Sequence, residues 1–216
     1  MITGSEHICD VKKEIENAYC NSSNRMGWRL LASPESTMSG ARVAFIGLNP
    51  GGSAVDVEQS VFAMPAGKSA YVDESWGGRP AGQNPLQRQV QALFARLDVE
   101  PSEVLAGNLV PFRSPNWASI GDPKDSLVFG KALWGRILKQ AAPSVVITMS
   151  GDTTEAVADI LGIASLTRFP IGWGNITAQR GEFKGVTLIG LPHLSRFGVM
   201  NRTASAHHLD TLFAGV

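Results

Sequence analysis

The sequence lacks several features that would place the chain in a specialised class. It has no apolar run long enough to span a bilayer, so we expect no membrane contact. Its first ten residues lack the apolar core of a signal peptide, which predicts a cytoplasmic protein. Nineteen lysines and arginines balance nineteen aspartates and glutamates, so neither sign of charge dominates. A nucleic-acid partner would therefore have to bind a local basic patch.

Cysteine is scarce as well, because Cys9 and Cys20 are the only two. In a cytoplasmic protein we expect both thiols to stay reduced. Two thiolates are too few for the usual four-cysteine iron–sulfur cluster. Adjacent His207 and His208 cannot face one metal ion from the same helix, and no other ligand cluster stands out. We therefore expect neither a metal nor another cofactor.

The length and the pattern of the chain predict one α/β domain over residues 1–216. Short, mostly apolar segments indicate strands at 42–48, 104–112, 144–149 and 186–191. Helical spacing or capping residues predict helices at 10–19, 84–97, 122–142, 153–161 and 203–213. Residues 53–83 and 167–183 are expected to be irregular. Strands that alternate with helices predict a three-layer α/β/α sandwich around a four-stranded parallel sheet.

Polar residues follow each predicted strand where it ends. Asn49 follows the first strand, and Asn108 and Ser114 lie in and after the second. Ser150 follows the third strand, and His193 follows the fourth. Because the carboxyl ends of parallel strands face one crevice, we expect these side chains to converge there.

Three common site motifs are missing from these strand ends. The turn after the first strand has no P-loop lysine, and no strand is followed by the glycine pattern of a dinucleotide site. The segment around Ser150 lacks the elbow sequence of a serine hydrolase. The polar residues therefore need another explanation.

The segments Gly47-Leu-Asn-Pro-Gly51, Asn108-Leu-Val-Pro-Phe-Arg113 and His193-Leu-Ser195 together resemble the motifs of the uracil-DNA glycosylase superfamily. The first segment is most similar to the mismatch-specific thymine/uracil branch. The likeness covers residues 42–202 in order. Leu194 replaces the usual proline of the third motif, Leu48 replaces the glutamine of the classical uracil enzymes, and the iron–sulfur cysteines are missing.

This resemblance implies an enzyme that hydrolyses the bond between deoxyribose and a pyrimidine flipped out of DNA. Asn49 would orient the attacking water, and neutral His193 would donate to the oxygen of the departing base. Asn108 would read the pyrimidine edge with its amide. The remaining contacts to the base would come from Leu48, Pro50, Gly51 and an aromatic residue, Trp76 or Phe62.

The resemblance also implies how DNA would be held. Ser195 and Arg196 would bind a phosphate, Phe197 would fill the vacated stack, and Arg113 would add positive charge. We expect a monomer. Two alternatives remain open from the sequence: base release from free nucleosides or nucleotides, and a catalytically idle protein that binds a base.

Overall fold

The computed structural model describes residues 4–53 and 57–216, which contain a six-stranded sheet of order β2-β1-β3-β6-β5-β4. The strands are β1 (Val43–Gly47), β2 (Leu105–Asn108), β3 (Val145–Met149), β4 (Thr167–Trp173), β5 (Ile176–Phe183) and β6 (Val186–Leu191). The helices are α1 (Gly4–Cys20), α2 (Ala70–Asp73), α3 (Pro85–Arg96), α4 (Pro123–Ala141), α5 (Gly151–Leu161) and α6 (Ala206–Leu212). Three short 3₁₀ helices are η1 (Glu35–Met38), η2 (Trp117–Ser119) and η3 (Thr203–Ser205).

The sheet has a parallel half that the sequence predicts and an antiparallel half that it does not. Strands β2, β1, β3 and β6 are parallel and lie within the four predicted segments, although β2 ends at Asn108 and not at residue 112 as predicted. Strands β5 and β4 continue the sheet in antiparallel pairing. The predictions of a four-stranded sheet and of an irregular 167–183 segment are therefore wrong. Ile171 is the one fully buried residue of β4, so the strand carries little alternation, and Pro170 is tolerated because β4 is an edge strand.

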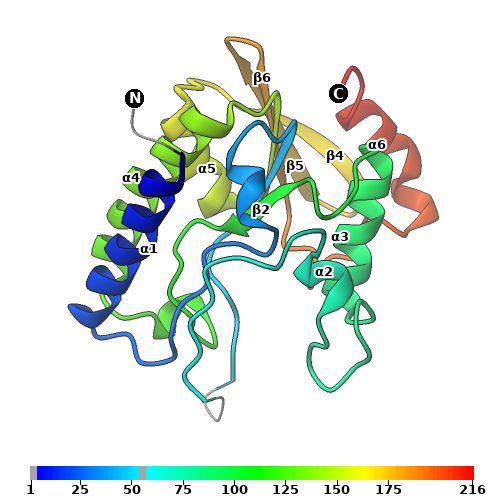
Figure 1. Cartoon of the computed structure of the whole chain (residues 1–216). Helices are drawn as coiled ribbons and strands as arrows, with labels where there is room; N and C mark the ends of the chain where they lie inside the picture. Colours follow the sequence, from blue (N-terminus) through cyan, green and yellow to red (C-terminus); the bar gives the residue numbers. More distant parts are fainter. Residues whose placement is uncertain (1–3, 54–56) are drawn as a thin grey trace.

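Helices cover both faces of the sheet and make three layers (Figure 1). Along β1, Ala44 and Ile46 join the core beneath α1, α4 and α5. Val43 and Phe45 point to the opposite core, which α2, α3 and α6 close. Every residue of β1 is buried, as expected for a central parallel strand. In the described parts of the chain, every helix is too short or too polar to cross a bilayer.

An extended segment covers the outer edge of β2. The backbone N–H of Asn108 donates to the carbonyl of Leu30 at 3.1 Å, and the N–H of Ala32 donates to Ala106 at 2.8 Å. Trp28, Leu30 and Leu31 of this segment are buried in the core. Their backbone therefore also protects a sheet edge that would otherwise be open to pairing with another chain.

Two glycines of α4 offer a matched test of how tightly this helix packs on the sheet. A methyl group on Gly130 would lie 2.3 Å from the carbonyl oxygen of Leu109, whereas one on Gly135 would have Ile160 as its nearest neighbour at 3.9 Å. Gly130→Ala should therefore destabilise the protein by about 1–3 kcal/mol. Gly135→Ala should stabilise it by up to about 1 kcal/mol, because alanine favours the helix. Urea denaturation measures both, and equal effects would contradict this packing.

Candidate functional site at the carboxyl edge of the parallel strands

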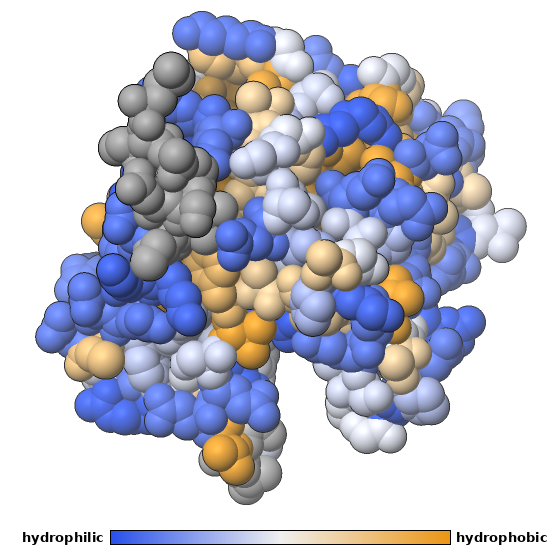
Figure 2. Space-filling model, in the orientation of Figure 1, coloured by the Kyte–Doolittle hydropathy of each residue, from blue (hydrophilic) through white to orange (hydrophobic). Residues whose placement is uncertain are grey.

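Strand register places the polar residues along one edge of the sheet. Gly47 of β1 is level with Asn108 of β2, and Met149 of β3 is level with Leu191 of β6. The order along this edge is therefore Asn108, Asn49, Ser150 and His193. The loop after β1 extends from this side in Figure 1, and Figure 2 shows the molecule indented on the same side.

The side chain of Asn49 is held in a defined orientation. Its Nδ2 donates to the carbonyl of Pro50 at 3.2 Å and to the hydroxyl of Ser114 at 3.0 Å. The single hydroxyl proton of Ser114 is used on the carbonyl of Asn116 at 2.7 Å, so this hydroxyl must accept from Asn49. The NH₂ group of Asn49 therefore faces Ser114. Its Oδ1 has no protein donor among the described residues and can accept a hydrogen bond from a ligand or water.

Gly47 makes room for the amide of Asn108. A methyl group at position 47 would lie 3.0 Å from Oδ1 of Asn108 and 3.7 Å from Cε of Met149. The backbone of Asn108 is fixed on both sides, because its N–H donates to Leu30 and its carbonyl accepts from the indole of Trp134 at 2.7 Å. The side-chain amide of Asn108 makes no hydrogen bond within the described residues. It is a half-buried group with a donor and an acceptor to offer.

Ser150 lies between these amides and His193 in a strained conformation. Its φ of 94° and ψ of 150° belong to a region that is essentially restricted to glycine. The backbone is held there because the N–H of Ser150 donates to the carbonyl of Leu191, and its hydroxyl bonds to that of Thr153. Such strain clusters at functional sites, where the surrounding structure imposes it.

His193 is linked to Ser195 within the loop after β6. The Ser195 hydroxyl and Nδ1 of His193 are 2.7 Å apart. When the serine donates, the neutral imidazole carries its proton on Nε2 and can donate to a ligand. His193 lies at the surface, but neighbouring protein atoms partly desolvate its ring, which lowers the pKa of His193 below its ordinary value and favours this neutral form.

The two predicted stacking residues are both half-buried and both packed against the protein. The indole N–H of Trp76 donates to Glu74 at 2.8 Å, and its ring packs edge-on against Tyr71 with centroids 5.4 Å apart. Glu74 also forms a two-pronged pair with Arg29 at 2.8 and 2.7 Å. Burial acts to raise the pKa of Glu74, but this pair outweighs it and the pKa is lowered. Phe62 packs against the core beside α4, so these contacts do not single out either ring.

The turn after β1 is tied to the segment after β2. The Arg113 side chain donates to the carbonyls of Gly51 at 3.4 Å and Met26 at 3.3 Å. The Leu48 carbonyl accepts from the Val110 N–H at 2.8 Å. Pro50 is buried, and the space around the missing side chain of Gly51 is open. These contacts make Arg113 a support for the turn in addition to any DNA role.

The predicted DNA-binding residues after β6 lie on the surface around a buried anchor. Leu194 is only 1% exposed and packs in the core. Ser195 and Arg196 are exposed, and Phe197 is half-buried. The guanidinium of Arg196 lies 5.8 Å from the ring centroid of Phe197. Leu194, which replaces the proline expected from the resemblance, therefore anchors the loop.

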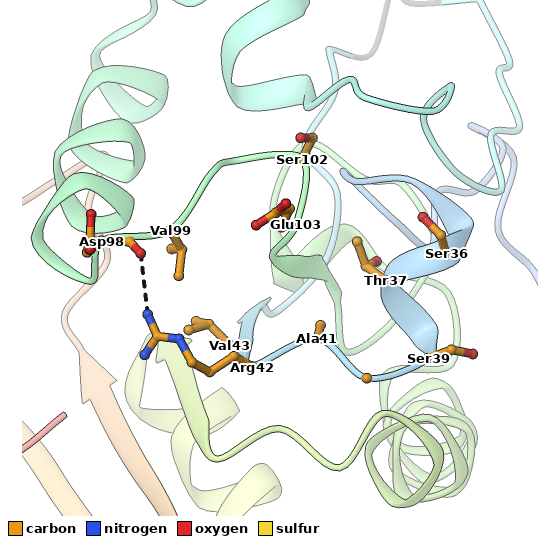
Figure 3. Close-up of a pocket in the computed structure, with 11 residues that line it drawn as sticks. Ser36, Thr37, Ser39, Ala41, Arg42, Val43, Asp98, Val99, Ser102 and Glu103 are labelled. Carbon is orange, nitrogen blue, oxygen red and sulfur yellow. Dashed lines mark hydrogen bonds between the residues drawn. The ribbon is translucent and has the colours of Figure 1, made fainter.

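Two open hollows lie at the other edge of the sheet. One, of about 410 Å³, is lined by Arg42 and Val43 before and in β1 and by the turn that contains Asp98 and Glu103 (Figure 3). The other, of about 540 Å³, adjoins it beside α3. In the first, Arg42 already donates to the carbonyls of Leu97 and Asp98. Neither hollow contains a residue that the sequence predicts for the site.

The fold and this edge define an α/β protein with a polar site at the carboxyl ends of its parallel strands. No protein-family model matches the chain, and no curated protein matches it. Within residues 4–53 and 57–216, no group of three histidine, cysteine, aspartate or glutamate side chains is placed to hold a metal ion. Cys20 carries a free, exposed thiol.

Sequence reasoning located the edge but missed how it is built. Ser114 was expected at this edge without a role, and it orients Asn49. Gly47 enters the sequence analysis only as the first residue of a motif segment, and in the structure it leaves space for Asn108. A signal for Ser114 was its position after β2, level with the turn that contains Asn49. The sequence did not predict the strained backbone at Ser150, because positive φ angles are expected at glycine and serine rarely adopts them.

The lowered pKa of His193 predicts a specific dependence of stability on pH. The folded protein binds the proton at His193 more weakly than the unfolded chain. Its stabilising contribution is therefore complete above about pH 6.5, the ordinary histidine value, and is lost as the pH falls through the folded-state pKa. The difference in unfolding free energy between the wild type and His193→Gln should shrink between pH 7.5 and pH 5. Urea denaturation measures it, and a difference that is independent of pH would refute the shift.

Proposed function

We propose that the protein is a DNA glycosylase that hydrolyses the N-glycosidic bond of uracil, or of a related mismatched or modified pyrimidine, flipped out of DNA. We propose further that β2, β1, β3 and β6 with their helices form a uracil-DNA glycosylase-like fold. The observation that carries the proposal is the alignment of an oriented asparagine, a second amide and a neutral histidine along one edge.

The spacing of the strands suits a single planar base. Asn49 and His193 each follow a strand end by two residues, and β3 lies between these strands. Neighbouring strands lie about 4.8 Å apart, so the two residues start from backbones about 10 Å apart. That width accommodates one heterocycle with a hydrogen bond on either side. Asn108 lies beside Asn49 and offers the donor and acceptor that a pyrimidine edge requires.

The proposed reaction breaks the bond from C1′ to the base nitrogen and forms a bond from C1′ to a water oxygen. Oδ1 of Asn49 accepts a hydrogen bond from this water and orients it. An amide cannot take up the proton, which passes to solvent. The bonding electrons leave with the base as an anion, and Nε2–H of His193 donates to the anionic base oxygen. A positioned donor of this kind is worth about 10² to 10³ in rate.

Oligonucleotides with a defined target base test the proposal directly. Single strands that contain uracil, and duplexes with uracil or thymine opposite guanine, should yield abasic sites that alkali cleaves. Asn49→Ala and His193→Ala should each slow base release by about a hundredfold or more. Asn17→Ala, an exposed asparagine on α1, is the matched control and should retain wild-type activity. Absence of abasic product from every substrate would refute the proposal.

Two other outcomes would point to the alternative functions. Base release from free nucleosides without release from DNA would assign the site to small substrates. Tight binding of uracil or of an abasic duplex without turnover would indicate an idle base-binding protein.

Ser114 should act as a positioning residue for Asn49. Ser114→Ala removes the acceptor that fixes the amide, so the water should be held less well. We expect kcat to fall by about tenfold to a hundredfold while KM changes little. Ser114→Thr keeps the hydroxyl and should restore part of the activity. Ser165→Ala removes an exposed hydroxyl before β4, away from this edge, and should have no effect. A loss confined to KM would contradict the positioning role.

A further inference from the structure

The turn between β4 and β5 lies at the same edge as the candidate site. Strand β5 is antiparallel to β6, and β4 is antiparallel to β5, so β4 runs in the direction of β6. Gln179 is level with Gly190, and Trp173 is level with Ile176 at the end of the hairpin. Trp173 therefore ends β4 two strands from β6, on the side where β6 leads into His193.

The chain around this turn is depleted of acidic residues, although the whole protein is neutral. Between Asp159 and Asp210, Glu182 is the only acidic residue. The same segment contains five basic residues: Arg168, Arg180, Lys184, Arg196 and Arg202. The carboxylate of Glu182 is paired with Arg180. The balanced net charge of the protein thus conceals a local excess of positive charge.

Trp173 is the centre of an aromatic and basic cluster that also contains Phe197 and Arg202. The guanidinium of Arg202 lies 4.7 Å from the centroid of the Trp173 ring, a cation–π geometry. Arg202 also donates to the carbonyl of Gly172. The ring of Phe197 meets Trp173 edge-on with centroids 6.0 Å apart. A methyl group on Gly172 would lie 2.3 Å from the carbonyl of Ala204, so the hairpin is packed closely on the chain after Arg202.

The two arginines of this surface have no acidic partner among residues 4–53 and 57–216. Arg196 and Arg202 are exposed and form no ion pair within the described residues. Arg96, on the nearby helix α3, is by contrast paired with Asp210 at 2.7 Å. The charges of Arg196 and Arg202 are therefore available to an anionic partner.

We propose that Trp173, Arg202, Phe197 and Arg196 form a platform that binds a single strand of DNA beside the candidate site. Arg202 takes a phosphate, and the half-buried Trp173, with Arg202 over its ring, offers the part of the indole that remains exposed to an unstacked base. The proposal rests on the proposed function for the location of the target base. It adds a binding surface on the hairpin, two strands beyond β6.

The guanidinium of Arg202 is already arranged for a phosphate. Stacking on Trp173 and bonding to Gly172 restrict its guanidinium, so less side-chain freedom is lost on binding. Most of its N–H groups remain for phosphate oxygens. Basic grooves lined by aromatic rings bind single strands without sequence preference, because every base has a face that can stack.

Fluorescence anisotropy with a labelled twenty-nucleotide oligothymidine tests the platform without any excisable uracil. At 0.1 M salt, loss of one phosphate contact should weaken binding about fivefold and reduce the salt slope by about 0.7. Arg202→Gln should show both effects. Arg202→Lys keeps the charge but not the planar stack, so it should retain the slope and bind less tightly than the wild type. Trp173→Leu should weaken binding while leaving the slope unchanged.

Lys184→Gln is the matched control. It removes the same charge from the same acid-poor segment, but at the turn between β5 and β6 on the opposite edge. It should bind the strand like the wild type. Equal losses of affinity in Arg202→Gln and Lys184→Gln would show that any positive charge contributes equally, which would overturn the platform. Unchanged binding in Arg202→Gln, or no wild-type binding at 50 mM salt, would also overturn it.

These results are separable from those on base excision. Arg202→Gln is an exposed substitution, so it tests the platform even when Trp173→Leu lowers stability. Strand binding that depends on Arg202, without release of any base, would support the platform and refute the glycosylase. Release of a base from DNA, together with strand binding that does not depend on Arg202, would support the glycosylase and refute the platform.

Discussion

The parallel pairing of β1 with β2 on one side and β3 on the other is the constraint on which the candidate site depends. It fixes Gly47 level with Asn108 and brings the turn that contains Asn49 to the same edge. Strand β1 is fully buried, so a shift of its pairing register by one residue would turn Val43 and Phe45 towards the wrong core. Hydrophobic burial in the two cores therefore determines which polar groups meet at the edge.

The orientation of the polar groups at this edge is set by neighbouring residues that take no direct part in the proposed reaction. A serine hydroxyl with one proton determines the orientation of the Asn49 amide, because that proton is already used on the carbonyl of Asn116. Because Gly47 has no side chain, there is space beside it for the side-chain amide of Asn108. Ser150 adopts a conformation suited to glycine because β6 and α5 hold it there. A preorganised site has this character, since its groups need little rearrangement on binding.

The neutral net charge of the protein suggests weak binding to nucleic acid, but the distribution of its charges is uneven. Most of its negative charge lies outside the segment that forms β4, β5, β6 and the loops after them. The antiparallel strands place the aromatic end of β4 beside the loop that contains His193 and Arg196. The fold thus gathers aromatic rings on one surface with arginines that form no ion pair in the described part of the chain.

The sequence by itself determined the parallel half of the fold, because buried strands and amphipathic helices leave strong apolar patterns. It also placed Asn49, Asn108 and His193 at the strand ends, since parallel topology sends those ends to one edge. It did not reveal the β4–β5 hairpin, because Pro170 and nearby glycines interrupt an exposed edge strand with little alternation. Only the tertiary structure decided the orientation of Asn49 by Ser114, the strain at Ser150 and the packing of Arg202 on Trp173. These three features depend on how closely segments distant in sequence approach one another or on individual backbone angles. Neither of these two causes produces a periodic pattern in the amino-acid sequence.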